Sequence, residues 1–434
     1  MSETESSSVG CCAVDHNRRP HSASQPGWRA IEHLLLQHGE VGLEHFHLLC
    51  KLGSGDIGKV FLCEIKNKNN NPFKTQLVPK RYYAMKVVDN ESLREKNKLK
   101  RAETEKQVLS MLDHPFLPTL YAKFDAHQHS CLIMDYCHGG DLFKLQQRQS
   151  GFHFSISTAK FYAAEVLLAL EYLHMKGIIY RDLKPENVLI QEDGHIMLSD
   201  FDLSLHCEVH PKLVESLVTS KRLKKPTLCC EEPKEHMKRK NKKMGAVAEG
   251  MLSARGAQKV NIEMSAEPIT ARSESFVGTH EYLAPEIILG FGHGSAVDWW
   301  AFGVFLYELL YGFTPFRDKN NKETLKNIIE QSLSFPRTQF KDRKDSEEIR
   351  EAQDLIRKLL VRNPEKRLGY TRGSCEIKKH EFFEGVNWAL IRSVKPPIVP
   401  RDLDQDTNKI PFSSRKQIVK KKATFEAPQQ IDYF

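Results

Sequence analysis

The chain has 434 residues, of which 40% are hydrophobic and 28% are charged, and it carries a formal net charge of +8 at pH 7. This length exceeds one ordinary core, and the composition is typical of a soluble globular protein with two lobes or domains. No run of about 18 uncharged apolar residues occurs, and the start MSETESSSVG has no basic or apolar region, so neither a membrane span nor a secretory signal is expected. The ten cysteines are therefore expected to be free thiols.

The first part of the chain predicts a small β-rich lobe behind a polar extension. Residues 1–45 are rich in Ser and His and are predicted to be poorly ordered, apart from a short helix near 31–39. Short β-forming runs dominate 46–137, and one amphipathic stretch at 92–112 has apolar residues near helical spacing. We therefore expect a small sheet that carries one main helix.

The second lobe is expected over 138–383 and should be mostly helical. A long apolar run begins at Ser157, a residue type that caps helices, and ends at Gly177. Apolar residues lie nearly all round this run, as they do in a buried helix. Further helices are predicted at 296–311, 322–331 and 348–361.

Two segments depart from this pattern. Residues 206–268 are rich in Lys, Glu and Ser and poor in aromatic residues, which predicts a disordered basic insertion within the second lobe. Residues 384–434 form a Pro- and Lys-rich tail that is expected to run over the surface.

A glycine-rich loop follows the first predicted strand. Its glycines fit the pattern G-x-G-x-x-G, which lets backbone amides approach phosphates. The same pattern occurs in dinucleotide-binding loops, but those lead into a helix, and here a strand follows. A hairpin over a nucleotide is therefore favoured, formed by Leu52, Gly53, Ser54, Gly55, Asp56, Ile57, Gly58, Lys59 and Val60.

Lys86 lies in the β-forming run YYAMKVV, which also contains Ala84. A strand lysine can simply point to solvent, but a lysine turned inward toward phosphates would need a carboxylate partner. Glu105 follows 19 residues later in the predicted helix and shares the face of Val108, and Glu103 is the competing candidate.

The segment YRDLKPENVLI is the strongest chemical signal in the chain. Asp182 would accept the proton of an attacking hydroxyl, and Lys184 would steady a transferring phosphoryl group. Asn187 and Asp200 would bind magnesium. Two acids and an amide that converge on metal and phosphate fit phosphoryl transfer by positioning and charge neutralisation.

The metal-binding motif itself raises a question, because it reads Asp200-Phe201-Asp202 where a protein kinase would have Asp-Phe-Gly. The chain is therefore either a working enzyme with an unusual loop or a scaffold that has lost its chemistry. Farther along, Glu286 in GTHEYLAPE is predicted to form a buried structural ion pair with Arg367.

Over 46–383 these motifs resemble eukaryotic protein kinases, and HPFLPTLYAKF, GGDLF and IIYRDLKPENVLI resemble the AGC group of serine/threonine kinases. Asp-Phe-Asp followed by a long insertion before SFVGTHEYLAPE is similar to the plant AGC VIII subfamily, and LGSGDIGKV and AVDWWAFGVFLYELLYG resemble its PINOID-type members. The resemblance implies an α+β, bilobal kinase fold, with a small β-rich N-lobe and a larger helical C-lobe. It also implies that ATP and two magnesium ions occupy the cleft, and that Asp-Phe-Asp is compatible with activity.

The resemblance also implies roles for residues around the nucleotide. Met134 corresponds to the gatekeeper behind the adenine, and the segment from Asp135 to Cys137 corresponds to the hinge. Losing the glycine after Phe201 should hinder a flip of the loop more than it hinders metal binding.

Ser275 matches the activation-loop phosphosite of the group, and Ser273 is a second candidate. Arg181 and Arg101 would receive the phosphate through charge-assisted hydrogen bonds. Leu205 stands where many relatives keep a basic phosphate ligand, which would weaken the coupling between phosphorylation and activity.

Three acids match positions that bind arginines upstream of the target residue in AGC kinases, namely Asp141, Glu186 and Glu308. The alternative is that they are ordinary surface acids and one buried ion pair. Thr279 fits serine or threonine acceptors rather than tyrosine. For PINOID-type kinases the resemblance implies auxin efflux carriers as substrates.

The chain ends in IDYF, a degenerate form of the hydrophobic motif with which AGC kinases dock on their own small lobe or recruit an upstream kinase. Its positions are Ile431, Tyr433 and Phe434. The alternative is a solvent-exposed tail end, although exposed aromatic residues usually find cover.

Three basic clusters lie at 221–226, 238–243 and 415–422. They favour anionic lipids at the cytoplasmic face of the plasma membrane, with the cytosol and the nucleus as alternatives. No reader fold supports specific nucleic-acid binding, and a monomer is expected. Free thiols are favoured over acylation at Cys11, Cys12, Cys229 and Cys230.

A pseudokinase scaffold that bridges membrane and partners is the rival interpretation. A pseudokinase is expected to have replaced at least one of the catalytic residues, but all four are present, namely Lys86, Asp182, Asn187 and Asp200.

Overall fold

The computed structural model describes residues 25–66, 81–209, 212–217, 260–265, 267–268, 271–337 and 343–400. The chain divides into a large unit, Met1–Pro211 with Ala266–Phe434, and a small unit, Lys212–Ser265. Within the described ranges, no helix combines the length and the apolar character needed to cross a membrane.

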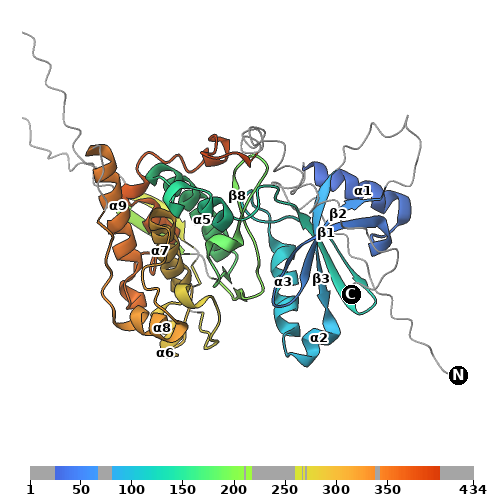
Figure 1. Cartoon of the computed structure of the whole chain (residues 1–434), viewed down its shortest axis with the longest axis horizontal. Coiled ribbons are helices and arrows are strands. Elements are labelled where there is room, and N and C mark those ends of the chain that lie inside the picture. Colours follow the sequence, from blue (N-terminus) through green and yellow to red (C-terminus); the bar gives the residue numbers. More distant parts are fainter. Residues whose placement is uncertain are drawn as a thin grey trace, which may run out of the picture. The chain divides into compact units, whose positions relative to one another are not determined.

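The N-lobe contains one antiparallel sheet of five strands in the order β1-β2-β3-β5-β4 (Figure 1). The sheet confirms the β-rich lobe expected from the sequence, because all five strands lie within 46–137, although the run that forms β4 was not predicted. The strands are β1 (Phe46–Ser54), β2 (Lys59–Ile65), β3 (Tyr82–Asp89), β4 (Leu120–Ala126) and β5 (His129–Asp135).

The single helix predicted at 92–112 is wrong, because the structure has two helices there, α2 (Asn90–Glu95) and α3 (Leu99–Met111). The side chain of Asp89 accepts hydrogen bonds from the first backbone amides of α2 and so starts that helix early. Between the helices Asn97 has a φ of 55°, a left-handed conformation that a continuous helix does not permit.

The short helix expected near 31–39 is present, but it begins earlier, as α1 (Pro26–His38), and packs on the N-lobe sheet. The prediction that the remainder of 1–45 is poorly ordered is therefore wrong from residue 26 onward. Trp28, Ile31 and Leu34 of this helix are buried, and the Trp28 ring lies edge-on to Tyr121 at 5.2 Å. Proline in the first turn and Gly39 after the last residue were the local signals for this helix. Residues 1–24 lie outside the described part of the chain.

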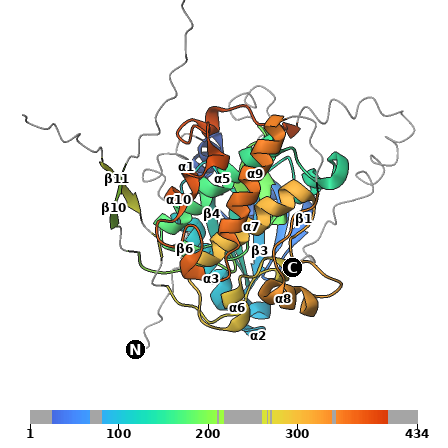
Figure 2. The ribbon, with the colours of Figure 1, turned by 90° about the vertical axis from the view of Figure 1, so that its left-hand side faces the viewer.

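The C-lobe is built on two long helices, α5 (Ile156–Met175) and α7 (Ala296–Tyr311), which pack together, and α9 packs on α7 (Figure 2). The mostly helical lobe is confirmed, and every residue of α7 is buried. The capping residue of α5 is Ser155 rather than Ser157, because the Ser155 hydroxyl accepts the hydrogen bond of the Thr158 amide. The remaining helices are α4 (Leu142–Gln147), α6 (Pro285–Leu289), α8 (Asn321–Glu330), α9 (Arg343–Leu359) and α10 (Ser374–Lys378).

Two short antiparallel pairs lie between α5 and the activation segment and carry the loops of the site. They are β6 (Ile178–Ile179) with β9 (Leu205–His206), and β7 (Val188–Ile190) with β8 (Ile196–Leu198). Short 3-10 helices complete the lobes at η2 (Leu43–His45), η3 (Ser150–Phe152), η4 (Pro185–Asn187), η5 (His280–Tyr282), η6 (Pro364–Lys366), η7 (Glu381–Phe383) and η8 (Ile391–Ser393).

The prediction that 206–268 is disordered throughout is wrong at both ends of that segment. In the small unit, β10 (Lys212–Leu217) pairs with β11 (Val260–Ser265) in an antiparallel register without shifts. The residues of β11, VNIEMS, alternate apolar and polar, a local pattern that the polar composition of the whole insertion conceals. The basic clusters at 221–226 and 238–243, and Cys229 and Cys230, lie outside the described residues.

The ion pair predicted between Glu286 and Arg367 is present and buried. The guanidinium binds both carboxylate oxygens, with Nη1 at 2.7 Å from Oε1 and Nη2 at 2.9 Å from Oε2. Nη1 also donates to the Ala296 carbonyl at the start of α7. This bidentate geometry connects the activation segment to the core of the C-lobe.

The tail is described as far as residue 400, and this part contacts the C-lobe. Arg392 forms an ion pair with Asp193 at 2.6 Å, and a Cβ at Gly194 would overlap the Ile398 carbonyl region. The predicted docking residues Ile431, Tyr433 and Phe434, the cluster at 415–422, and Cys11 and Cys12 all lie outside the described residues.

Candidate active site

A buried lysine joins the sheet, a helix and the metal-binding motif. Lys86 of β3 is 7% exposed, and its Nζ lies 2.6 Å from Oε1 of Glu105 on α3 and 3.4 Å from Oδ1 of Asp200. Burial opposes the charge of Lys86, but Glu105 and then Asp200 outweigh it and raise the pKa of the ammonium. Glu103, the competing candidate, is exposed on the same helix.

The glycine-rich loop forms the turn between β1 and β2. Gly58 approaches β3 so closely that a Cβ there would lie 2.8 Å from the Val87 carbonyl oxygen. At Gly53 a Cβ would meet no atom within 4 Å, so the space beside this residue is open. The Gly55 amide donates to the Gly58 carbonyl at 2.9 Å and closes the turn.

Side chains of the loop have different surroundings. Asp56 binds Lys98 and Arg101 at the start of α3, with Arg101 at 3.2 Å, and the hydrogen bond from Lys98 is the main cause that lowers the pKa of Asp56. Ile57 is buried against Val88, so its side chain belongs to the core rather than to a ligand site. Among the other predicted loop residues, the exposed ones are Leu52, Ser54 and Lys59, and Val60 is half-buried.

The predicted adenine region lies where β3 and β5 pair. Ala84 is opposite Met134 in the strand register, and Cys137 is buried with its Sγ 3.6 Å from Sδ of Met197 on β8. Met197 contributes to this region from a distant strand, and no local sequence signal identified it. Burial is the main cause that raises the pKa of the Cys137 thiol.

The Asp135 side chain does not face this region. Its carboxylate accepts hydrogen bonds from the Thr119 amide at 2.9 Å and from the Tyr121 hydroxyl at 2.5 Å, both on the β4 side. Only the backbone of Asp135 therefore remains available to a nucleotide.

The predicted catalytic residues meet around the Asp182 carboxylate, which is buried. Oδ2 accepts hydrogen bonds from Lys184 Nζ and Asn187 Nδ2, both at 2.8 Å. Oδ1 accepts one from the Thr279 hydroxyl at 3.0 Å, and Lys184 also donates to that hydroxyl at 2.9 Å. The network joins the catalytic loop to the activation segment, although Thr279 is 97 residues from Asp182.

Asn187 and Asp200 stand at adjacent ends of the β7–β8 pair. Asn187 immediately precedes β7, Asp200 follows β8 by two residues, and the Ser199 amide donates to the Asn187 carbonyl at 2.8 Å. Their side chains offer amide and carboxylate oxygens, the donor set that Mg²⁺ prefers. The described residues contain no cluster of three or more His, Cys, Asp or Glu that could hold a metal ion.

Asp202 is accommodated without backbone strain. The left-handed conformation in this motif falls on Asp200, with a φ of 59°, while Asp202 is not among the residues of positive φ. Asp202 is 7% exposed, and burial followed by the charge of Asp200 raises its pKa to about 7. A glycine is therefore not sterically required at this position in this conformation.

The predicted phosphosites share one basic side chain. Arg181 Nη1 lies 3.0 Å from the Ser273 hydroxyl and 2.9 Å from the exposed Ser275 hydroxyl. Burial and the nearby charge of Arg101 lower the pKa of Arg181 to about 10, although Asp298 opposes this. Arg101 is thus close enough to act on Arg181, but its own ion pair is with Asp56.

Two of the three predicted substrate-binding acids already have partners. Asp141 caps α4 by accepting from the Lys144 amide and ammonium, at 2.8 and 2.6 Å. Glu308 of α7 accepts a hydrogen bond from the Tyr282 hydroxyl and is 8% exposed. Burial, and then the carboxylates of Glu186 and Glu281, raise the pKa of Glu308 to about 7.

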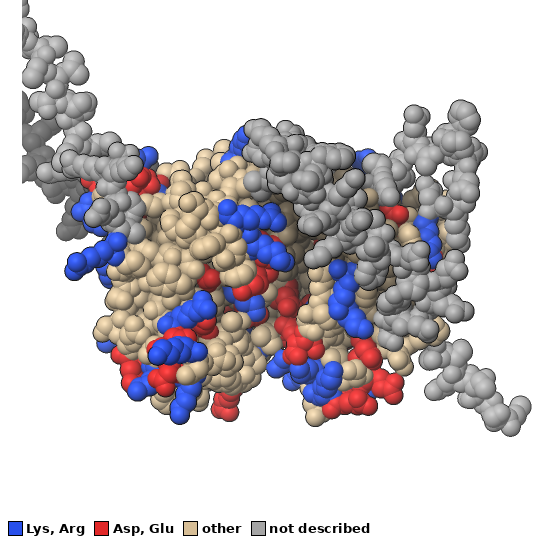
Figure 3. Space-filling model, viewed as in Figure 1, with Lys and Arg blue, Asp and Glu red and all other residues tan. Residues whose placement is uncertain are grey.

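These carboxylates form one acidic region, because Asp141 acts on the pKa of Glu186, and Glu186 acts on that of Glu308. Glu186 is exposed, and Glu281 is an addition that sequence reasoning missed. Figure 3 shows acidic side chains gathered in the hollow between the two lobes on the face that it displays.

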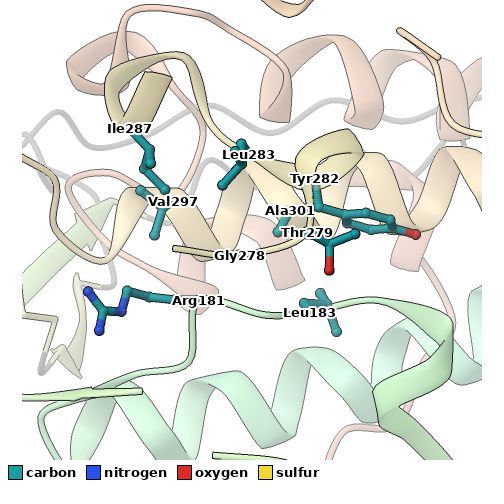
Figure 4. Close-up of a pocket in the computed structure, with 9 residues that line it drawn as sticks. All are labelled: Arg181, Leu183, Gly278, Thr279, Tyr282, Leu283, Ile287, Val297 and Ala301. Carbon is teal, nitrogen blue, oxygen red and sulfur yellow. The ribbon is translucent and has the colours of Figure 1, made fainter. Parts of the chain in front are cut away.

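A small pocket lies between the catalytic loop and the activation segment (Figure 4). The catalytic loop supplies Arg181 and Leu183 on one side, and the other walls come from the activation segment, α6 and α7. The lining residues are Arg181, Leu183, Gly278, Thr279, Tyr282, Leu283, Ile287, Val297 and Ala301.

Sequence reasoning also missed Asp298, which supports the catalytic loop from α7. Its carboxylate accepts hydrogen bonds from the Tyr180 and Arg181 amides, both at 2.8 Å, and from His174. It lies 117 residues from Arg181, so only the fold reveals this contact.

Comparisons with known proteins agree with this geometry. The sequence model of the family described as protein kinase domain matches residues 46–236 and 259–383. Protein kinase PINOID 2 of Oryza sativa subsp. japonica is 48% identical over 96% of this chain and 90% of its own length. Protein kinase PINOID 2 of Arabidopsis thaliana is 46% identical over 93% of this chain and 86% of its own length. Serine/threonine-protein kinase RHS3 of Arabidopsis thaliana is 49% identical over 89% of this chain and 74% of its own length.

The chain therefore belongs to the protein kinase family, among the plant AGC VIII serine/threonine kinases that include the PINOID proteins. The resemblance expected from the motifs is confirmed, and so are the bilobal kinase fold and the serine/threonine kinase class.

The buried ion pair yields a direct test on the enzyme. Glu105→Gln removes the charge that holds Lys86, so kcat/KM for ATP should fall by about 100-fold, because Lys86 then loses its position. Glu103→Gln is the matched control on the exposed side of α3 and should change kcat/KM by less than about twofold. Equal losses in the two variants would contradict the role assigned to the Lys86–Glu105 pair.

Proposed function

We propose that this serine/threonine kinase transfers the γ-phosphoryl group of ATP through the constellation around Asp182. The observation that carries the proposal is the hydrogen-bonded convergence of Asp182, Lys184, Asn187 and Thr279 next to Asp200 and its partner Lys86. Asp182 orients the acceptor hydroxyl and takes its proton, and Lys184 stabilises negative charge on the transferring group. Lys86, held by Glu105, binds the α- and β-phosphates.

Magnesium fits the oxygen donors of Asn187 and Asp200. Bound Mg²⁺ supplies neutralisation of the phosphate charge that develops during transfer. Asp200 is oriented for this by Lys86, and Asn187 is oriented by its two hydrogen bonds to Asp182, one to the side chain and one to the carbonyl. Glycines in the loop, with open space beside Gly53, would let backbone amides approach the phosphates.

The role of Asp182 is tested by phosphate transfer from labelled ATP to a serine peptide, for wild type and Asp182→Asn. The variant keeps the shape and the hydrogen-bond acceptor at one oxygen but removes the base, so kcat should fall by about 1,000-fold or more. ATP binding, followed by equilibrium titration, should change by less than about fivefold. An Asp182→Asn enzyme with near-wild-type turnover would refute this assignment.

We propose further that the substrate sequence is basic before its serine or threonine. Asp141 acts electrostatically on Glu186, and Glu186 and Glu281 act on Glu308. Arginine side chains would satisfy these groups with charge-assisted hydrogen bonds.

If this proposal holds, binding of a basic substrate depends on pH through Glu308, whose pKa is raised to about 7. Below that value Glu308 is protonated and neutral, so its attraction for arginine is lost as the pH falls. The KM of a peptide with arginines before its serine should therefore rise about threefold between about pH 8 and pH 6.

In Glu308→Gln this change in KM should disappear, while a peptide with alanines in place of the arginines should show none in either enzyme. A basic-peptide KM that is independent of pH in wild type, or a pH dependence that survives in Glu308→Gln, would contradict the assignment.

Phosphorylation of Ser275, or of Ser273, is proposed to regulate the enzyme. Arg181 contacts both hydroxyls and immediately precedes Asp182, so a phosphate there would bind next to the catalytic loop. Leu205 pairs with Ile179 in the β6–β9 pair, so that position adds no second cation to the phosphate.

The cellular role of the kinase is proposed from the resemblance to PINOID-type kinases. Auxin efflux carriers would be substrates, at the cytoplasmic face of the plasma membrane, with the cytoplasm and the nucleus as further locations. The three basic clusters would bind anionic lipids, and the terminal Ile431, Tyr433 and Phe434 would dock on the small lobe or recruit an upstream kinase.

A further inference from the structure

His174, near the end of α5, has a carboxylate on each ring nitrogen. Its Nε2 lies 2.8 Å from Oδ2 of Asp298 on α7, and its Nδ1 lies 2.9 Å from Oε2 of Glu267. The side chains of His174 and Asp298 are fully buried, and that of Glu267 is 6% exposed. Trp299 packs edge-on against the imidazole, at 4.7 Å between ring centres. Water therefore does not screen the charges of this group.

The hydrogen bonds define the protonation state of His174. A carboxylate can only accept, and a neutral imidazole has one N–H to donate. Because both ring nitrogens face carboxylate oxygens, the ring must be an imidazolium to satisfy them both. Burial opposes that charge, but Glu267 and Asp298, the charged groups that contact the ring, raise the pKa of His174 to about 10.

Asp298 connects His174 to the catalytic loop. Its two oxygens accept the amides of Tyr180 and Arg181 as well as the imidazolium. Arg181 has a φ of 68°, a left-handed conformation that is unfavourable for a residue other than glycine and that needs support from its surroundings. Arg181 directly precedes Asp182, so the support from Asp298 positions the catalytic aspartate.

Glu267 comes from the end of the insertion, two residues after β11. Its carboxylate lies where Gly373 leaves room, because a Cβ at Gly373 would overlap it. The contact with His174 therefore depends on one acidic side chain from the insertion and on one glycine of the C-lobe.

We propose that Glu267 is a positioning residue for phosphoryl transfer, which keeps His174 charged and thereby fixes the Asp298 carboxylate that orients the catalytic loop. The C-terminal end of the insertion is then energetically coupled to turnover. Displacement of this end from His174 lowers kcat without contact with ATP or with the protein substrate.

Glu267→Gln in the full-length chain is the first test. The amide keeps the size of the side chain and can donate to Nδ1, so packing is retained while the charge is lost. With one carboxylate instead of two, the pKa of His174 falls toward its ordinary value of about 6.5, and the ring loses its second proton as the pH rises. In wild type that loss occurs only near a pKa of about 10.

The assay measures transfer from ATP, with magnesium, to a peptide with arginines before its serine. At about pH 8.5 the kcat of Glu267→Gln should be about tenfold below wild type, and at about pH 6 it should be within about twofold. The KM for ATP should stay within about twofold at both pH values, because no nucleotide contact is changed. Thermal unfolding, measured at both pH values, gives the fraction of enzyme that is folded. The kcat values are then calculated per folded molecule.

Gly373→Ala is the second test, because it displaces Glu267 without changing any charged side chain. Gly385→Ala is its matched control: Gly385 also has a positive φ, of 83°, but a Cβ there would meet no atom within 4 Å. Gly373→Ala should reproduce the pH-dependent loss of kcat seen with Glu267→Gln, and Gly385→Ala should not.

Three results would overturn the proposal. One is a wild-type kcat for Glu267→Gln at both pH values, and another is an equal loss at both, which general destabilisation would produce. The third is a Gly373→Ala enzyme that behaves like Gly385→Ala. Absence of transfer by wild type itself would instead count against the proposed function.

Discussion

The active site depends on one buried ammonium group. Lys86 comes from β3, Glu105 from α3 and Asp200 from the turn after β8, so this cluster joins the sheet and the helix of the N-lobe to the metal-binding motif of the C-lobe. A buried charge is stable only when its partners outweigh its desolvation, and here two carboxylates do so. Hydrogen bonds then connect Ser199, the residue before Asp200, to Asn187, and Asn187 to Asp182. The loss of any of these contacts changes the position of the next group in the series.

The unusual Asp202 fits this arrangement without disturbing the backbone. The left-handed residue in the motif is Asp200, so a side chain at Asp202 causes no conformational strain. Its cost is electrostatic, since burial and the neighbouring Asp200 raise its pKa to about 7. The substitution of Asp for Gly therefore changes the charge near the metal-binding residues while leaving Asp182, Asn187 and Asp200 in place.

The sequence was sufficient where a function depends on local chemistry. The turn at Gly55–Gly58, the catalytic loop around Asp182 and the long buried helices could all be predicted from spacing and hydrophobic pattern. The choice of Glu105 over Glu103 followed from helical periodicity, and the Glu286–Arg367 pair was predicted from the motifs that contain the two residues. Some errors were local, such as the interruption of the helix at Asn97 and the cap at Ser155, and others concern contacts between distant segments. The packing of Trp28 on the sheet, the inward turn of the Asp135 carboxylate and the support of Arg181 by Asp298 join residues that no local pattern relates. Averaging over a long polar segment concealed the strands at both ends of the insertion.

The central claim is that Asp-Phe-Asp forms part of a working phosphoryl-transfer site. The most direct measurement compares the initial rate of magnesium-dependent phosphate transfer from ATP to a basic serine peptide for wild type and Asp202→Gly, with the folded fraction of each measured by thermal unfolding. We predict that wild type turns over, and that Asp202→Gly remains within about tenfold of it, because the metal-binding oxygens of Asp200 and Asn187 are unchanged. A wild-type enzyme that binds ATP but transfers no phosphate, beside an Asp202→Gly variant that does, would show that the aspartate disables the site and would contradict the claim.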